Sequence, residues 1–242
     1  MLLGFSEHLH HAVGAQPGER VLDIGCGGGP TSAAYARAVG ARGEVLAVDI
    51  STPILKVAQS RYADLDNLRF EVADAAAHPF RTEYYDVVTS RYGVMFFPDP
   101  PAAFSNLARA VHANGRLCMM VWRKLEDNPW MGAPARAAFS VLPRPEKAQP
   151  GTPGPFALAD PEMVSGLLVN AGFGDVELKP VDEPIVLGSV DDALHWLTRM
   201  GPAARPLADA GSADQQRATA AMRAELENNI GTQGVTYPGG AW

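Results

Sequence analysis

A glycine-rich turn between an apolar segment and the start of a helix constrains this chain more than any other feature. The stretch runs Arg20-Val-Leu-Asp-Ile-Gly-Cys-Gly-Gly-Gly-Pro30. Because glycine has no Cβ, a ligand can sit directly on main-chain N–H groups there. The helix that Pro30 opens would present these groups at its N-terminus, which attracts anionic groups. The turn predicts a site for a nucleoside-type ligand, and a tight turn that binds nothing is the alternative.

Composition excludes several classes of protein. The chain has 242 residues and a formal net charge of −7, with no cluster of Lys and Arg, which argues against a nucleic-acid binder. Its two cysteines, Cys26 and Cys118, lie far apart, so a disulfide framework or a cysteine metal site is not expected. The sequence shows no signal peptide and no apolar run of membrane-spanning length, so a cytoplasmic protein is expected.

Apolar runs alternate with helical patterns through the first half of the chain. Continuous apolar runs are typical of parallel strands covered by helices on both faces. The predicted strands are 21–24, 45–49, 68–72, 85–90 and 116–122, and the predicted helices between them are 31–39, 53–62 and 101–111. Later helices are predicted at 160–171, 191–200 and 214–228, with a strand at 176–187 interrupted at Pro184 and the start of a last strand at 234–242. The pattern predicts a doubly wound α/β fold.

The spacing of the turn points to a family. A dinucleotide fingerprint reads G-x-G-x-x-G, and Pro30 stands where its third glycine would be. The turn reads D-x-G-x-G-x-G instead, beginning at Asp23. Here the chain resembles the class I S-adenosylmethionine-dependent methyltransferases, in the small-molecule branch related to ubiquinone and menaquinone biosynthesis. The resemblance runs from Gly18 to about Trp130. It implies a mostly parallel seven-stranded sheet of Rossmann-like type, a small lid from the late helices, and S-adenosyl-L-methionine converted to S-adenosyl-L-homocysteine.

The resemblance also implies residues that bind the cofactor. The loop would hold the amino-acid end of the cofactor, through Asp23, Gly25, Cys26, Gly27 and Gly29. Asp49 ends the second strand, where a carboxylate can accept two hydrogen bonds from ribose hydroxyls. Ile50 would touch the adenine.

Two further segments complete the expected cofactor site. Asp74 would accept from the adenine amino group, with Ala73 and Ala75 beside it. Ser90 and Arg91 open the segment to Phe97 that would pass under the sulfonium. Simpler interpretations remain for several of these residues: Asp23 and Asp49 as turn and helix caps, Asp74 as a solvated acid, Cys26 as a small filler.

Residues for catalysis are harder to identify. Methyl transfer needs alignment and exclusion of water, no metal, and a base only where the acceptor loses a proton. Arg91 and Tyr92 are the polar candidates nearest the acceptor, and His195 is a candidate base or a packing residue beside Trp196. In residues 2–13, His8 and His11 share one helix face and His10 points elsewhere. A solvated face is favoured over a catalytic base for these histidines. We expect a small, partly apolar acceptor, with O-methylation of a phenol or quinol favoured and carbon or nitrogen open.

The chain is expected to form one domain, residues 1–242. Residues 1–125 would form the cofactor-binding half, 126–160 a Pro- and Gly-rich connector or lid, and 161–242 the last strands and cap helices. The brief ends favour a chain that lacks part of its N-terminal cover and of its last strand. Monomer and homodimer are both open.

Two rival functions remain. One is a non-catalytic cofactor-binding or scaffold protein with the same fold. The other is an NAD(P)-dependent oxidoreductase, which Pro30, Asp74 and the lack of a Tyr-x-x-x-Lys pair disfavour.

Overall fold

The computed structural model describes residues 2–146 and 152–242, and these form two compact units. The parallel-sheet unit contains residues 5–122, 152–179 and Trp242. The antiparallel-sheet unit contains residues 2–4, 123–146 and 180–241. The expectation that residues 1–242 form a single domain stays a prediction.

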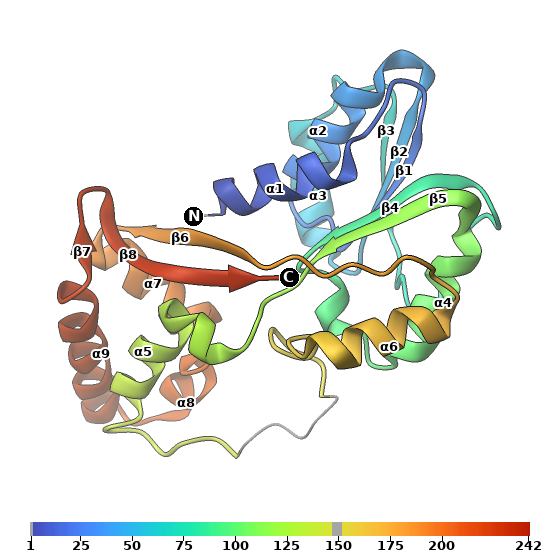
Figure 1. The fold of residues 1–242 in the computed structure, drawn as a ribbon. Helices are drawn as coiled ribbons and strands as arrows, with labels where there is room; N and C mark the ends of the chain where they lie inside the picture. The colour runs from blue at the N-terminus through green and yellow to red at the C-terminus, as the bar shows by residue number, and fades with distance from the viewer. Residues whose placement is uncertain (1, 147–151) are drawn as a thin grey trace. The chain divides into compact units, whose positions relative to one another are not determined.

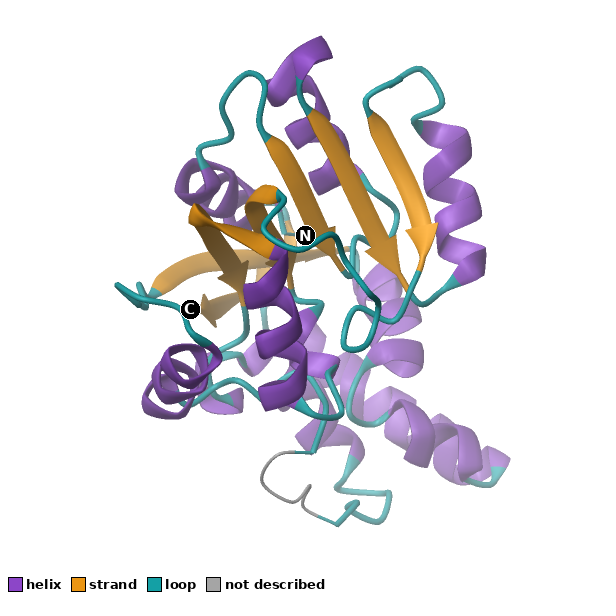
Figure 2. Ribbon diagram, turned by 90° about the vertical axis from the view of Figure 1, so that its right-hand side faces the viewer, coloured by secondary structure: helices purple, strands orange, loops and turns teal. Residues whose placement is uncertain are grey.

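A five-stranded parallel sheet forms the centre of the parallel-sheet unit, with the order β3-β2-β1-β4-β5. The strands are β1 (Arg20–Ile24), β2 (Glu44–Asp49), β3 (Leu68–Val72), β4 (Tyr85–Arg91) and β5 (Val111–Met120). Figure 2 shows arrowheads of neighbouring strands directed to the same edge of the sheet. The predicted alternation of strands and helices in this half of the chain is confirmed.

Helices cover both faces of this sheet, as Figure 1 shows. On one face lie α1 (Leu3–Val13), α2 (Pro30–Val39) and α3 (Thr52–Arg61); on the other lie α4 (Pro100–Ala110) and α6 (Pro161–Ala171). Central strand β1 is buried on both sides, since residues 21–24 are at most 1% exposed. Its apolar run is therefore explained by two covered faces.

Local sequence signals fix the ends of these helices. Asp160 caps α6, because its Oδ1 accepts hydrogen bonds from the N–H groups of Glu162 and Met163, at 3.0 and 3.3 Å. Gly172, with a φ of +104°, ends the same helix in the left-handed region. The helix predicted for 160–171 is thus confirmed, with both of its caps.

Helix α1 packs through an apolar stripe and is tied to β5 by one arginine. Phe5, Leu9 and Val13 are at most 2% exposed. The Arg116 guanidinium donates to the carbonyl of Val13 from Nε and Nη2, at 2.8 and 2.7 Å, and forms an ion pair with Glu19. Burying the stripe and capping the last carbonyls both stabilise the helix in this position.

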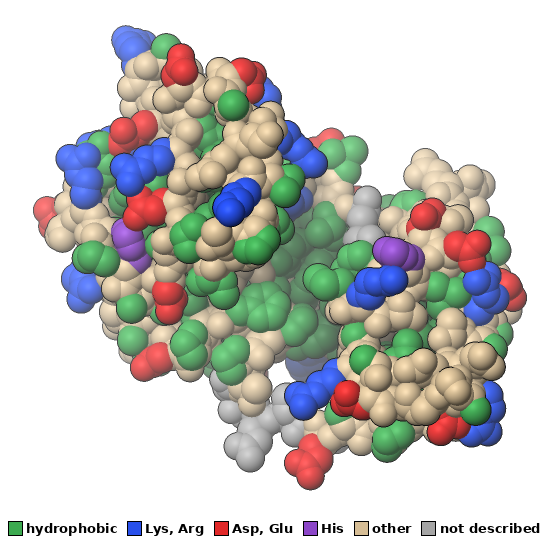
Figure 3. All heavy atoms as spheres, turned by 180° about the vertical axis from the view of Figure 1, so that it is seen from behind, with side chains coloured by type: hydrophobic (Ala, Val, Ile, Leu, Met, Phe, Trp, Pro, Cys, Tyr) green, Lys and Arg blue, Asp and Glu red, His purple; other side chains and the backbone are tan. Residues whose placement is uncertain are grey.

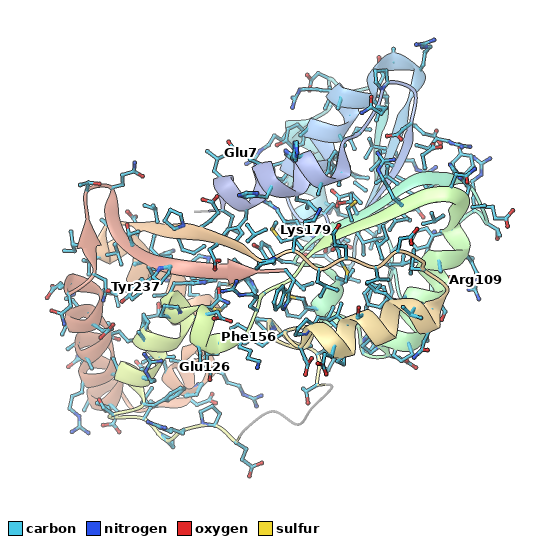
Figure 4. All side chains as sticks on the ribbon, in the orientation of Figure 1. Glu7, Arg109, Glu126, Phe156, Lys179 and Tyr237 are labelled. Carbon is cyan, nitrogen blue, oxygen red and sulfur yellow. The ribbon has the colours of Figure 1, made fainter. Side chains whose placement is uncertain are left out.

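The antiparallel-sheet unit has a three-stranded sheet with the order β6-β8-β7. Its strands are β6 (Val181–Gly188), β7 (Ile230–Gly231) and β8 (Gly234–Ala241); its helices are α5 (Pro129–Ala138), α7 (Val190–Met200), α8 (Ala204–Asp209) and α9 (Ser212–Glu227). Tyr237 of β8, labelled in Figure 4, donates from Oη to Glu225 of α9. Fully buried Asn128 donates to the carbonyl of Gly240 at 2.9 Å and accepts from its N–H at 3.1 Å, which joins the start of α5 to β8.

The prediction of one seven-stranded sheet is not confirmed. The last two long strands pair antiparallel with each other in a separate sheet. In the parallel-sheet unit, Trp242 exchanges two backbone hydrogen bonds with Val121, at 2.9 and 3.1 Å, but this single pair extends no strand there. Pro184 does not interrupt β6: it pairs with Pro238, and β6 is an edge strand, which tolerates a residue without an N–H.

The segment predicted as a connector or lid, 126–160, contains helix α5, and its residues 147–151 lie outside the described part of the chain. Within residues 2–146 and 152–242, no helix combines the length and apolar character that a membrane crossing requires. The same residues hold no group of three or more His, Cys, Asp or Glu side chains arranged to bind a metal ion.

Asp86 gives the fold a specific sensitivity to acid. Its carboxylate accepts from the N–H and Nε of Arg20, at 2.7 and 3.0 Å, and lies 2.8 Å from Nε2 of His112. Burial alone would raise the pKa of Asp86, but the hydrogen bonds from Arg20 and His112 lower it. This carboxylate thus joins three strands of the sheet.

Replacing Asp86 with asparagine should lower the free energy of unfolding by about 1.5 kcal/mol near neutral pH, the scale of a partly exposed charged hydrogen bond. Because the folded-state pKa is depressed, this contribution is complete above the ordinary value of 3.8 and is lost as the pH falls below it. Urea titrations of both proteins across that range measure the difference. If the difference in the free energy of unfolding between the two proteins does not change with pH, the charge of Asp86 is not involved.

Candidate functional site

Two glycines of the Gly-rich turn are required by packing. Gly25, with a φ of +66°, lies so close to Gly93 that a Cβ there would be 2.7 Å from the Gly93 Cα. Gly29, with a φ of +79°, lies against Phe70, whose ring a Cβ would approach to 2.7 Å. Neither contact needs a ligand, so these positions alone would be consistent with a turn that binds nothing.

The other two glycines face open space. A Cβ at Gly28 would meet no atom within 4 Å, and one at Gly27 would meet only Cδ1 of Ile54, at 3.7 Å. These glycines precede Gly29, the N-cap residue of α2. Residues 27 and 28 therefore form a cradle, an open stretch of backbone at a helix N-terminus.

Asp49 connects this cradle to the next helix. Its Oδ2 accepts from the N–H of Gly27 and its Oδ1 from the N–H of Ser51, each at 2.9 Å. These bonds go to the turn and to Ser51, the N-cap residue of α3, so Asp49 does not itself cap that helix. Each carboxylate oxygen has a second lone pair and can accept again. Next to it, Ile50 is 75% exposed, an unusual position for a large apolar side chain. A half-buried carboxylate beside an exposed apolar side chain and an open glycine backbone fits an adenosine-bearing molecule.

Cys26 points away from the cradle. It is 8% exposed and packs in a core cluster with Ala47 and Leu55. Burial raises the pKa of the Cys26 thiol, and the nearby carboxylates of Asp23 and Asp49 raise it further. The side chain is thus a small apolar filler, although its backbone N–H donates to the carbonyl of Val48 and shapes the turn.

The loop after β3 is held by α4. Ala73 and Ala75 are buried, whereas Asp74 between them is exposed and its Oδ1 accepts from the N–H of Ala76 at 3.0 Å. Asn106 donates to the carbonyl of Ala75 at 3.2 Å, and its own amide oxygen accepts from Arg109, which Figure 4 labels. The anchored loop leaves the Asp74 side chain accessible at the same edge as Asp49.

Ser90 fastens the end of β4 to the end of β1. Its Oγ donates to the carbonyl of Ile24 at 2.8 Å and accepts from the N–H groups of Gly93 and Val94, at 3.1 and 3.3 Å. The side chain is fully buried. Ser90 is therefore a positioning residue that holds the two loops against each other.

Arg91 and Tyr92 come next and point in different directions. Arg91 donates from Nη1 to Oγ of Ser6 in α1, at 2.5 Å. The Tyr92 ring stacks on Trp122, with centroids 4.0 Å apart and planes at 12°, and Phe5 meets both rings edge-on. Tyr92 has a φ of +66°, and its buried Oη has no hydrogen-bond partner within the described chain. Leaving a buried hydroxyl unpaired costs about 1–3 kcal/mol.

Asp23 lies beneath the turn. It is 1% exposed and accepts a hydrogen bond of 2.6 Å from Oγ of Ser32. Burial raises the pKa of Asp23 to about 7, although the Ser32 hydroxyl and the Arg91 charge oppose the shift, and the like charge of Asp49 adds to it. A carboxyl group in this state supports the turn from below without contacting solvent.

Other predicted residues lie elsewhere. His195 is exposed on α7 of the antiparallel-sheet unit, where its neighbour Trp196 packs on Trp130, so it is not placed relative to the residues above. Phe97 is buried against Phe104, whereas Phe96 is 54% exposed.

Sequence reasoning missed the close approach of Gly93, the Phe5 contact and the inward position of His10, whose buried Nε2 has no partner among the described residues. The amphipathic pattern of residues 2–13 could have indicated Phe5. No sequence signal pairs Gly93 with Gly25, because they lie in the loops after different strands.

Known proteins match this arrangement. A family model described as a methyltransferase domain matches residues 22–119. A ubiquinone/menaquinone biosynthesis C-methyltransferase of Stutzerimonas stutzeri is 31% identical over 171 residues, which cover 66% of this chain and 67% of the relative. The corresponding enzyme of Shewanella woodyi is 27% identical over 186 residues, covering 72% and 74%.

Solved structures share the fold. The YcgJ protein from Bacillus subtilis aligns with a TM-score of 0.64 at 17% identity, covering 98% of this chain and 94% of that one. The [4+2]-cyclase SpnF aligns with a TM-score of 0.58 at 18% identity, covering 98% and 78%. At such identities the likeness concerns the fold alone.

The fold and the Gly-rich turn are typical of doubly wound α/β proteins that bind a nucleoside-type cofactor. The relatives make this specific: the chain belongs to the class I S-adenosylmethionine-dependent methyltransferases and is similar to the ubiquinone/menaquinone C-methyltransferases. It is an enzyme whose cofactor is S-adenosylmethionine.

Replacing Gly28 with alanine should weaken S-adenosylhomocysteine binding at least tenfold, about 1.4 kcal/mol. The reason is that the new methyl group occupies the cradle. The fold itself should tolerate the substitution, because a Cβ at Gly28 meets no atom within 4 Å and the residue has no positive φ. Calorimetric titration gives the dissociation constant, and thermal unfolding shows whether the fold is intact. Gly166→Ala is the matched control, since a Cβ at that glycine of α6 would likewise point into open space. Wild-type affinity in Gly28→Ala would remove the cradle from the binding site.

Asp23 should make the cofactor-free protein less stable as the pH rises. Because its folded pKa is raised above the ordinary 3.8, ionisation costs folding free energy progressively between pH 3.8 and about 7, and the cost is constant above. Asp23→Asn should remove this cost while keeping an acceptor for Ser32. The stability of the variant relative to wild type should therefore increase with pH over that interval in urea titrations. A difference that is flat with pH would contradict a protonated Asp23.

Proposed function

We propose that this methyltransferase methylates a small, partly apolar molecule that carries a phenol- or quinol-like ring, at the ring oxygen. The observation that carries this proposal is the stack of Tyr92 on Trp122, with Phe5 edge-on to both rings, next to the carboxyl ends of β4 and β5. Ligands of open α/β sheets bind beyond the carboxyl ends of the strands. A half-buried Tyr92 ring, backed by the buried rings of Phe5 and Trp122, suits a flat, apolar acceptor there.

The cofactor roles proposed for individual residues follow from their positions at the carboxyl ends of the parallel strands. Gly27 and Gly28 would offer backbone to the amino-acid end, Asp49 would accept from ribose hydroxyls, and Ile50 would cover the adenine. Asp74 is accessible enough to accept from the adenine amino group, with Ala75 beside it. S-adenosylmethionine supplies a methyl group on a positively charged sulfur, which keeps the electron pair of the bond that breaks.

The acceptor atom has two candidates. The names of the relatives, which are C-methyltransferases, support carbon. Oxygen stays our proposal because a phenol hydroxyl loses its proton far more readily than a ring carbon does. Tyr92 does not serve as the base, since burial raises the pKa of its hydroxyl. His195 stays a predicted base or substrate contact.

The surface supports a small-molecule acceptor. On the face that Figure 3 shows, Lys and Arg side chains are interspersed with Asp and Glu side chains, and the described residues in view form no basic patch. A net charge of −7 points the same way. A cytoplasmic location, and a monomer or homodimer, stay predictions.

The purified chain should methylate hydroquinone or catechol when it is supplied with S-adenosylmethionine labelled with ¹³C in the methyl group. Carbon NMR of the product distinguishes a methoxy carbon from a ring-bound methyl carbon, so it identifies the acceptor atom directly. A methoxy signal supports the proposal, and a ring-methyl signal would assign carbon instead. Turnover of aliphatic amines in place of both phenols would show that the acceptor class is wrong.

A further inference from the structure

Tyr92 combines two unfavourable features that a different residue would avoid. Its backbone lies in the left-handed region, with a φ of +66°, which is an outlier for a bulky side chain. Its Oη is buried without a hydrogen-bond partner among residues 2–146 and 152–242. Glycine would relieve the first and phenylalanine the second. Strain and unpaired polar atoms that persist in this way are concentrated at functional sites.

The surroundings of Tyr92 explain why its ring points where it does. The preceding Ser90 and the following Gly93 are fastened to the end of β1, and the Tyr92 N–H donates to the carbonyl of Met120 at 2.9 Å. With both flanks fixed, the ring is directed onto Trp122, 4.0 Å away and nearly parallel. The hydroxyl is therefore held at the end of β5, on the side of β4 away from the cradle of Gly27 and Gly28.

We propose that the Tyr92 hydroxyl donates a hydrogen bond to an oxygen on the ring of the methyl acceptor, and that it favours the oxyanion form of a phenol or quinol, whose proton is released to water. This inference rests on the proposed function. A hydrogen bond from a neutral donor to an oxyanion is charge-assisted and stronger than one between neutral groups.

The protonation state of the Tyr92 hydroxyl suits a hydrogen-bond donor. Burial raises the pKa of this tyrosine, so the hydroxyl keeps its proton and cannot act as a base, although the neighbouring Arg91 charge opposes the shift. The same Arg91 charge would favour an anion nearby. An ionised phenol has more electron density on its oxygen and on the ortho and para carbons of the ring, so an oxyanion held by Tyr92 is activated for methylation at oxygen or at carbon.

Tyr92→Phe removes only the hydroxyl and keeps the stacked ring. With hydroquinone and S-adenosylmethionine, we expect the KM for the phenol to rise about 10- to 100-fold, the range for a charge-assisted hydrogen bond. The dissociation constant of S-adenosylhomocysteine should stay unchanged, because the cradle is untouched. Tyr85→Phe is the matched control: this buried tyrosine begins the same strand, at its opposite end. Equal KM values in wild type and Tyr92→Phe would overturn the inference.

A second measurement does not need turnover. 4-Nitrophenol is titrated with alkali in the presence of protein and S-adenosylhomocysteine, and its ionisation is followed by absorbance. Bound to the wild type it should ionise about one pH unit lower than when bound to Tyr92→Phe, because only the wild type donates to the oxyanion. The same midpoint in both proteins, or no binding to either, would overturn the inference. If wild type methylates no phenol but still shifts the midpoint, the proposed function fails and the donor role stands.

Discussion

The backbone contact between Gly25 and Gly93 is the constraint on which the rest of the site depends. A Cβ at Gly93 would lie 2.6 Å from the carbonyl oxygen of Ile24 and 2.9 Å from the Cα of Gly25, so neither loop can carry a side chain where they meet. The Ser90 hydroxyl bonds both loops at this point. Because β1 and β4 are adjacent parallel strands, this contact fixes how both chains leave the sheet. The cradle of Gly27 and Gly28 lies on one side of this contact and Tyr92 lies on the other.

The two acids at this edge of the sheet, Asp23 and Asp49, have different surroundings. Asp23 is fully buried, has the Ser32 hydroxyl as its donor, and holds its proton up to about neutral pH. Asp49 is half-buried and accepts from two backbone N–H groups. One acid therefore lies in the interior, while the other lies at the surface with two backbone donors. The like charge of Asp49 is among the causes that raise the pKa of Asp23.

Much of the parallel-sheet unit could be predicted from the sequence, because its signals are local. The glycine turn, the Asp160 and Gly172 caps and the apolar runs each act within a few residues. The separate antiparallel sheet could not be predicted, since the pairing of β6 with β8 depends on partners about 50 residues apart. The candidate site divides in the same way. Asp49 and Ile50 follow from their place after a strand, whereas the Gly93 contact and the Tyr92 stack on Trp122 join different strands.

The fold by itself does not choose the chemistry, as the structural likeness to a [4+2]-cyclase illustrates. What varies between such proteins must lie outside the glycine turn, on the side where the acceptor is held. In this chain the turn and that side are connected in the backbone, because Tyr92, whose ring stacks on Trp122, directly precedes the Gly93 that packs against Gly25. The same backbone contact holds the glycine turn and the segment that carries Tyr92. Methyl transfer depends mainly on the alignment of donor and acceptor, so both halves of the site need such a fixed backbone.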